Sequence, residues 1–171
     1  MGLTGDEGAI RHVGGIPLRA DMVAAFLLDS KAPGQTLLLQ RRRDDKYAPG
    51  GFQMLYGHIE PGEYPEQTLA REIAEETGLK IEKFYSLNET LTFYDKVSRT
   101  IRMTPVFVAY LRTDTPLRLD ETEHCAAEWV SFGEAGRRLP WKAQREALSG
   151  LRELLSDDEG LPEIMRLEVP C

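Results

Sequence analysis

The 171-residue chain is poor in several features that define whole classes of protein. It has two cysteines, Cys125 and Cys171, which are too few for the disulfide framework of a small secreted domain. Its most apolar early run, Met22–Leu28, is far shorter than the ~20 residues that cross a bilayer. No basic segment followed by a long apolar run opens the sequence. These absences predict a cytoplasmic protein with no membrane partner, in which Cys125 is buried as a small apolar side chain.

Positive charge is also scarce. There are 21 Lys and Arg against 28 Asp and Glu, so the net charge is −7 and the pI is about 5.1. This balance argues against DNA or RNA as a partner, because proteins that hold nucleic acid through its phosphates usually present a basic surface. It allows a small phosphorylated substrate, since a bound metal ion can supply positive charge.

Turn signals and apolar runs predict one domain with more strands than helices. Residues 1–20 are expected to be a loose lead-in, residues 21–156 the folded domain, and residues 157–171 a C-terminal tail. The expected strands are Met22–Asp29, Thr36–Arg41, Phe52–Ile59, Lys83–Tyr94, Thr100–Arg112 and Ala127–Phe132. The expected helices are Glu66–Thr77, preceded by Pro65, and Trp141–Leu155. Pro105 predicts an edge strand or a bulge. Because strands and helices do not alternate strictly, the pattern indicates an α+β fold around a mixed sheet.

The expected helix Glu66–Thr77 has an apolar side and an acidic side. At about 100° per residue, the apolar arc consists of Leu69, Ala70, Ile73 and Ala74. The acidic side consists of Glu72, Glu75 and Glu76, whose i, i+3 and i+4 spacing brings the carboxylates together. Taken alone, such a face is consistent with a solvated helix surface.

These glutamates repel one another, because like charges four residues apart destabilise a helix by roughly 0.2–0.5 kcal/mol per pair. Arg71 can compensate Glu75 one turn later, which leaves Glu72 and Glu76 unrelieved. A hard divalent cation such as Mg²⁺ would relieve them, since it binds carboxylate oxygens and can bridge them to substrate phosphates. The pattern therefore favours a metal site on this helix.

The segment Gly57–Leu79 reads GHIEPGEYPEQTLAREIAEETGL. It resembles the signature of the Nudix hydrolase (MutT-like) family, G-x5-E-x7-R-E-U-x-E-E-x-G-U, in which U is aliphatic. The nine specified positions are occupied by Gly57, Glu63, Arg71, Glu72, Ile73, Glu75, Glu76, Gly78 and Leu79. The resemblance implies the Nudix fold, an α/β/α sandwich around a mixed β-sheet. It also implies hydrolysis of a diphosphate bond with Mg²⁺ as cofactor, for which Mn²⁺ can substitute.

Roles for the signature residues follow from this resemblance. Glu72, Glu75 and Glu76 are expected to bind the metal together with the backbone carbonyl of Gly57, and Glu72 and Glu75 are counted among the catalytic residues. Gly57 is expected to end a strand and let the following loop bend. The structural residues of the motif are Glu63 and Arg71, which are implied to pair, and Gly78, which follows the helix.

Three further candidates lie outside the signature. Glu123, in the acidic loop before the last strand, is the candidate general base; the alternative is a solvated acidic turn. His124 could orient a phosphate or that base, or simply be a hydrogen-bonded surface histidine. Arg41 or Arg42 could bind a substrate phosphate, and because side chains alternate on a strand only one or two of this basic run would point inward. The alternative for the arginines is a solvated basic turn.

The C-terminal run 139–145 and the residues around Glu123 look like the dihydroneopterin triphosphate pyrophosphatase branch of the family, also described as dATP pyrophosphohydrolase. The expected substrate is therefore a nucleoside triphosphate or a pterin triphosphate, cleaved to pyrophosphate and a monophosphate. Dinucleoside polyphosphates, nucleotide sugars and oxidised nucleotides are alternative substrates. A non-catalytic nucleotide sensor and an RNA-decapping enzyme are alternative functions. A homodimer is also compatible with the family.

Overall fold

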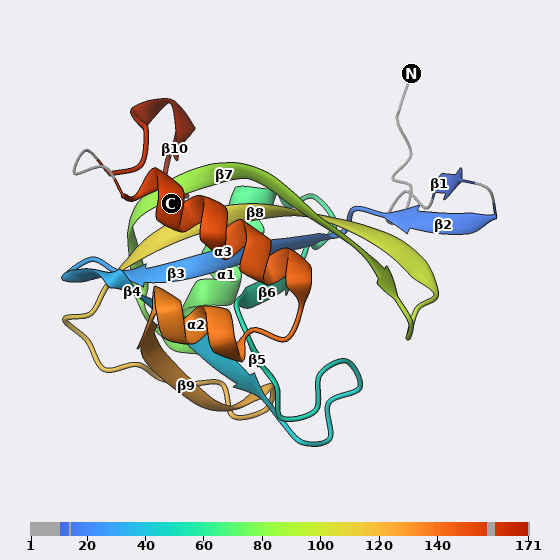
Figure 1. Cartoon of the computed structure of the whole chain (residues 1–171), viewed down its shortest axis with the longest axis horizontal. Helices are drawn as coiled ribbons and strands as arrows, with labels where there is room; N and C mark the ends of the chain where they lie inside the picture. The colour runs from blue at the N-terminus through green and yellow to red at the C-terminus, as the bar shows by residue number, and fades with distance from the viewer. Residues whose placement is uncertain (1–10, 14, 157–159, 171) are drawn as a thin grey trace.

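The structure is a computed structural model that describes residues 11–13, 15–156 and 160–170 (Figure 1). The strands are β1 (Arg11–Val13), β2 (Ile16–Arg19), β3 (Met22–Asp29), β4 (Ala32–Arg41), β5 (Phe52–Gln53), β6 (Leu55–His58), β7 (Lys80–Asp95), β8 (Thr100–Arg112), β9 (His124–Ser131) and β10 (Arg166–Leu167). The helices are α1 (Pro65–Thr77), α2 (Phe132–Arg138), α3 (Lys142–Leu154) and the 3-10 turn η1 (Glu163–Met165). Strands outnumber helices in these residues, as predicted.

Strand β8 makes the sheet mixed. It pairs antiparallel with β7 on one side and parallel with β3 and β2 on the other. Strand β3 also pairs antiparallel with β4 and β6, and β4 continues the sheet to β5 and β9. The expectation of an α+β fold around a mixed sheet is confirmed.

Strand β3 is buried on both faces of this sheet. Val23, Ala25 and Leu27 belong to the core cluster that includes Leu69 and Ile73 of α1. Ala24, Phe26 and Leu28 belong to the second cluster, which includes Ala147, Leu148 and Leu151 of α3. Side chains alternate between the two faces of a strand, so α1 and α3 cover opposite faces of the sheet, as Figure 1 shows. This is the helix–sheet–helix sandwich that the resemblance implied.

The expectation of an edge strand around Pro105 is wrong, because β8 lies inside the sheet. A bulge does lie opposite, where the register of β7 shifts between Ser86 and Glu89. On its other side, β8 pairs with β2 as far as Arg102 and with β3 from Val106. Pro105 thus lies in the stretch of β8 after its pairing with β2 ends and before its pairing with β3 begins, and a residue without an N–H donor is tolerated there.

Regular structure also occurs where none was expected. Strands β1 and β2 lie within the expected lead-in, of which residues 1–10 and 14 fall outside the described residues. Strand β10 extends the sheet beside β7 within the expected tail, of which residues 157–159 and 171 are likewise not described. Helix α2 was missed because it has seven residues and no full apolar stripe. The segment expected to be the third strand forms two short strands, β5 and β6.

Cys125 is exposed, so the expectation that it is buried is wrong. The register of β9 against β4 shifts at this point, with His124 opposite Arg41 and Ala126 opposite Gln40. Cys125 is the extra residue of this bulge and is turned out of the core. Within the part of the chain that the structure describes, no helix is both long and apolar enough to cross a membrane.

Candidate active site

Helix α1 holds the signature glutamates on one face of the sheet, beside β3 and β6. It begins at Pro65, and Gly78 ends it in a left-handed conformation (φ 66°) with its N–H donating to Ala74 O at 3.0 Å. The buried side chains of the helix are Thr68, Leu69, Ile73, Glu76 and Thr77. Ala74 is exposed, so the expected apolar arc is wrong at that position. The buried face is turned toward Glu76 instead, and one carboxylate is thereby drawn into the protein.

Arg71 binds three carboxylates of the signature. Its Nε and Nη2 donate to the two oxygens of Glu63 at 2.8 and 3.0 Å, and its Nη1 donates to Glu72 at 2.9 Å and to Glu75 at 3.2 Å. Nη2 also donates to the carbonyl oxygen of His58 at 3.0 Å. The bidentate contact with Glu63 holds the loop before α1 against the helix. The expectation that Glu72 is left unrelieved is wrong, because the planar fork of a guanidinium reaches several acceptors at once.

Glu63 itself is held from several directions. Thr68 Oγ1 donates to its Oε2 at 2.8 Å, and the backbone N–H of Glu60 donates to the same oxygen at 3.1 Å. The hydrogen bonds from Arg71 and Thr68 lower the pKa of the Glu63 carboxyl to about 2. The loop between β6 and α1 is therefore fixed around a carboxylate that stays ionised.

Gly57 is required for a reason other than the one expected. It lies within β6, which continues to His58, and its φ is not positive, so it neither ends the strand nor makes the turn. A Cβ atom at this position would lie 2.5 Å from Glu72 Cγ and 3.0 Å from its Cδ. Glycine allows the Glu72 side chain to lie directly on the strand. The bend comes later, at Gly62, whose φ is 90°.

Glu76 has a different partner. Its residue surface is 4% exposed, and its Oε2 lies 3.0 Å from Nε2 of His124, which is 0% exposed. His124 is therefore not a surface histidine, and Glu76 is not unrelieved, contrary to both expectations. Burial raises the pKa of the Glu76 carboxyl, while the hydrogen bond from His124 acts in the opposite direction.

The loop that carries Glu123 is attached to the C-terminal end of α1. The N–H groups of Arg118 and Asp120 donate to the carbonyl oxygens of Thr77 and Glu76 at 2.8 and 3.1 Å. These carbonyls have no partner inside the helix, so the loop satisfies them. One ligand atom each from Glu76, Glu123 and His124 then lie within 4.8 Å of one another.

The carboxylates Glu72 and Glu75 lie differently around this cluster. Burial raises the pKa of the Glu72 carboxyl, the hydrogen bond from Arg71 acts in the opposite direction, and the charges of Glu76 and Glu123 add to the rise. The side chain of Glu75 is 58% exposed and is held by Arg71. The described residues thus bring Glu76, Glu123 and His124 together, with Glu72 outside that 4.8 Å group and Glu75 at the rim.

The two candidate arginines differ in position. Arg41 Nη1 lies 4.0 Å from Glu123 Oε2 and 3.3 Å from Asp45 Oδ2, and Arg41 Nε is buried without a hydrogen-bond partner among the described residues. Arg42 is more exposed and pairs with Asp44 at 3.1 Å. Arg41, the last residue of β4, therefore lies beside Glu123, whereas Arg42 comes after the strand and pairs with Asp44.

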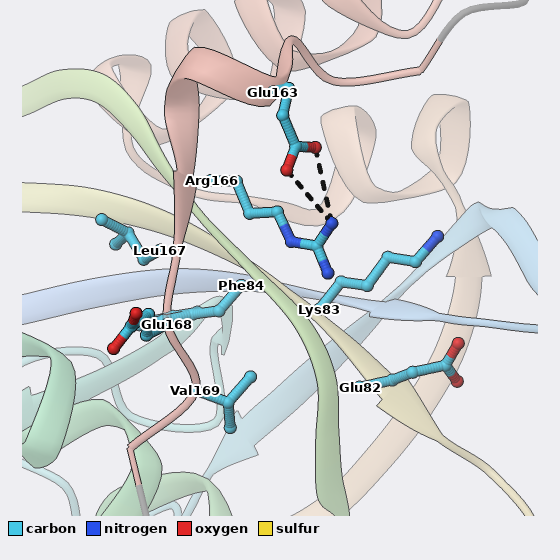
Figure 2. Close-up of a pocket in the computed structure, with 8 residues that line it drawn as sticks. All are labelled: Glu82, Lys83, Phe84, Glu163, Arg166, Leu167, Glu168 and Val169. Carbon is cyan, nitrogen blue, oxygen red and sulfur yellow. Dashed lines mark hydrogen bonds and ion pairs between the residues drawn. The ribbon is translucent and has the colours of Figure 1, made fainter.

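A hollow of about 510 Å³ lies elsewhere, between β7 and the C-terminal segment (Figure 2). It is lined by Glu82, Lys83, Phe84, Glu163, Arg166, Leu167, Glu168 and Val169. Arg166 and Glu163 form an ion pair in it at 3.2 Å. No signature residue lines this hollow, so it offers none of the chemistry of the glutamate cluster.

The donor atoms of the glutamate cluster suit a divalent cation. Carboxylate oxygens are the ligands that Mg²⁺ and Mn²⁺ prefer, and Glu76 is a buried carboxylate with no cationic side chain bonded to it in the described residues. The sequence interpretation did not foresee the partnership of His124 with Glu76. A histidine next to the candidate base was visible, but the contact spans 48 positions of the chain, and only the fold brings the two together.

The comparisons with known proteins agree with this geometry. Residues 18–151 match the family model described as the NUDIX domain. The chain is 33% identical over 134 residues to the Octanoyltransferase of Myxococcus xanthus, a match that covers 77% of this chain and 36% of that protein. It is 33% identical over 113 residues to the NAD-capped RNA hydrolase NudC of Mannheimia succiniciproducens, covering 64% of this chain and 40% of that protein. The chain spans less than half the length of these relatives.

Solved structures share the fold. The MutT protein of Methanosarcina mazei Go1 superposes with a TM-score of 0.69 at 22% identity, covering 83% of this chain and 98% of that one. The dihydroneopterin triphosphate pyrophosphohydrolase of E. coli superposes on this chain with a TM-score of 0.60 at 22% identity, covering 75% of this chain and 91% of that one. The domain model spans most of the chain, and the nine signature positions lie on β6, the loop after it, α1 and the two residues that follow α1, so this chain belongs to the Nudix hydrolase family.

Proposed function

We propose that the chain is a Mg²⁺-dependent diphosphohydrolase of a nucleoside triphosphate or a pterin triphosphate. Water attacks one phosphorus of the triphosphate, the bond to the bridging oxygen breaks, and pyrophosphate and a monophosphate leave. The observation that carries the proposal is the convergence of Glu76 and Glu123 within 4.8 Å of each other, in a chain that retains every signature glutamate. A nucleotide sensor would have no need of this complete acidic set.

In this proposal Glu72 and Glu76 hold the ion from α1, with Glu75 at the rim and the carbonyl of Gly57 on β6. Mg²⁺ bound there would neutralise phosphate oxygens and make a bound water a better nucleophile, and Mn²⁺ would substitute for it. Arg71 keeps Glu72 and Glu75 in place through its fork of hydrogen bonds. Its bidentate contact with Glu63 orders the loop that leads into the site.

Glu123 is the proposed general base and accepts the proton of the attacking water. Its side chain is 52% exposed, so solvent and substrate can reach it, while its backbone N–H is fixed on Asp120 O at 3.3 Å. Arg41, 4.0 Å from Glu123, is the proposed phosphate-binding arginine, because a guanidinium binds phosphate oxygens through paired N–H groups. Arg42 is engaged with Asp44 and has the weaker claim.

The substrate choice rests on likeness and charge. The fold likeness to the E. coli pterin enzyme is no greater than that to the Methanosarcina MutT protein, so it supports triphosphate substrates without separating the branches. The relative named for NAD-capped RNA makes NAD-like dinucleotides a further substrate class to test. The acidic balance favours small phosphorylated molecules over RNA.

The test is a substrate panel with Mg²⁺: nucleoside and pterin triphosphates, dinucleoside polyphosphates, nucleotide sugars and NAD, with released pyrophosphate and monophosphate counted. Triphosphates should give pyrophosphate, and a chelator should abolish turnover. Tight nucleotide binding without turnover of any member would favour the sensor.

Glu76→Gln should lower kcat by roughly 10³-fold. The change keeps the shape of the side chain but removes a charged ligand, and metal ions supply several kcal/mol of transition-state stabilisation, at about 1.4 kcal/mol for each tenfold in rate. Glu66→Gln, on the first turn of the same helix and outside the cluster, is the matched control and should keep its activity. Steady-state kinetics at saturating Mg²⁺ measure both, and full turnover in Glu76→Gln would remove the metal-site assignment.

A further inference from the structure

A fully buried histidine lies beside the acidic cluster, and the proposed mechanism does not use it. His124 is the first residue of β9, and its Nε2 lies 3.0 Å from Glu76 Oε2. We propose that His124 is a positioning residue, whose Nε2–H holds one oxygen of Glu76 and leaves the other oxygen to the divalent ion. The inference rests on the metal site of the proposed function, but it can fail or hold independently of the substrate.

The surroundings of the ring select one tautomer. Nδ1 of His124 is buried and has no hydrogen-bond partner among the described residues. A proton on Nδ1 would be a buried donor without an acceptor, and the lone pair of Nε2 would then face a carboxylate oxygen. A proton on Nε2 instead donates to Glu76 across 3.0 Å. The ring is therefore a neutral donor aimed at the carboxylate.

The same geometry argues against His124 as a metal ligand. Nε2 is directed at Glu76, and no part of the residue is exposed. Mg²⁺ usually keeps several of its waters when it binds to protein carboxylates, so it needs open space beside its ligands. Such space lies on the side of Glu123, whose side chain is 52% exposed. His124 therefore acts through Glu76.

The backbone makes this contact part of a larger link. His124 N–H donates to Asp120 O at 3.1 Å, and Asp120 N–H donates to Glu76 O at 3.1 Å. The side chain and the backbone of Glu76 are thus both held by the segment that contains Glu123. Groups that orient the ligands of a metal typically change metal affinity by 10–100-fold when they are lost. The contact should therefore set both the affinity for the ion and the place of Glu76 relative to the proposed base.

Direct metal binding tests the idea without reliance on activity. Mn²⁺ titrated into the full chain is followed by electron paramagnetic resonance, which reports the free ion. His124→Leu, which fills the buried site without a donor, should weaken Mn²⁺ binding by about 10–100-fold. His124→Gln, whose amide N–H can reach the position of Nε2, should recover most of the affinity. Thermal unfolding of each variant shows that it is folded, and an unchanged Mn²⁺ affinity in folded His124→Leu would overturn the proposal.

Two measurements on the unmodified protein do not depend on a variant's folding. Long-range ¹H–¹⁵N correlation spectra of the metal-free chain should show His124 as the neutral Nε2–H tautomer, and the Nδ1–H tautomer would overturn the proposal. The spectrum of bound Mn²⁺ should show no ¹⁴N coupling, because such a coupling would mean that a histidine binds the ion directly and would overturn the proposal.

Failure of the positioning role can be distinguished from failure of the proposed activity, because Mn²⁺ affinity and substrate turnover are measured separately. Loss of Mn²⁺ affinity in His124→Leu with no turnover of any substrate by the unmodified chain would support the positioning role and defeat the proposed activity. An unchanged Mn²⁺ affinity in folded His124→Leu, together with normal turnover by the unmodified chain, would overturn the positioning role and support the proposed activity.

Discussion

The carboxylates at the two ends of the acidic face of α1 are held in different ways. What we call the N-terminal end consists of Arg71 and the carboxylates that it binds. These are Glu63, in the loop before α1, and Glu72 and Glu75, all held through charged hydrogen bonds of 2.8–3.2 Å. At the C-terminal end, Glu76 is more deeply buried, and among the described residues its side chain is bonded to a histidine alone, with Glu123 as an acidic neighbour. One end carries its own cation, whereas the other has a neutral donor.

This difference explains how one helix can be both a scaffold and a site. A guanidinium supplies fixed positive charge and fixed geometry, so the carboxylates of the N-terminal end are held in place and partly compensated within the folded chain. A neutral imidazole can orient a carboxylate but cannot cancel its charge. Under the proposed function, the C-terminal end is therefore the one that a divalent ion completes, and Arg71 serves to hold the ligands that lie between the two ends.

The largest expected effect comes from removing the built-in cation. Arg71→Met should lower the free energy of unfolding by about 3 kcal/mol, because three carboxylates lose their partner while they stay partly buried. Urea unfolding measures this. The matched control is Arg152→Met on the exposed side of α3, which should change stability by less than about 0.5 kcal/mol. Equal stability of both variants would mean that the N-terminal end does not depend on its arginine.

The contrast between the two ends could be predicted only in part. The i, i+3, i+4 glutamates were sufficient for the acidic face and for helix α1, because these depend on local periodicity. The sandwich was implied by the family resemblance that the nine signature positions carry. Helical spacing matched Arg71 with Glu75, and the family resemblance implied its pairing with Glu63, but neither indicated its contact with the adjacent Glu72 in the folded rotamer.

Contacts distant in sequence were missed for the same reason. His124 and Glu76 meet because β9 pairs with β4 and the preceding loop docks on the end of α1, which no single segment encodes. The role of Gly57 was misread because its neighbour is a side chain from another element, Glu72, and the sequence shows only that a glycine stands there. Local patterns predicted the elements, and the packing of those elements decided the site.

A smaller effect is expected where the two ends meet, at the contact between Gly57 and Glu72. Gly57→Ala places a Cβ 2.5 Å from Glu72 Cγ, so the glutamate must leave the strand, at a cost of about 2 kcal/mol in stability. Turnover should fall further than the loss of folded protein explains, since Glu72 is a proposed ligand. Gly34→Ala in β4, where a Cβ meets nothing within 4 Å, is the control and should be near neutral in both assays. A fully active Gly57→Ala would show that Glu72 need not lie against β6.

The smallest expected effect is the pH dependence of the Glu63 contact. The pKa of Glu63 is lowered from 4.5 to about 2 in the folded chain, chiefly by Arg71. The unfolded chain therefore binds a proton first as the pH falls, and the stability that the contact contributes above pH 4.5 is lost progressively down to about pH 2. Glu63→Gln cannot titrate, so its free energy of unfolding should fall less steeply than that of the unmodified chain over this interval. Denaturant unfolding at closely spaced pH values gives the two slopes. Parallel curves would mean that Arg71 holds Glu63 no more firmly in the folded state than in the unfolded one, and the contrast in how the two ends hold their carboxylates would then be lost.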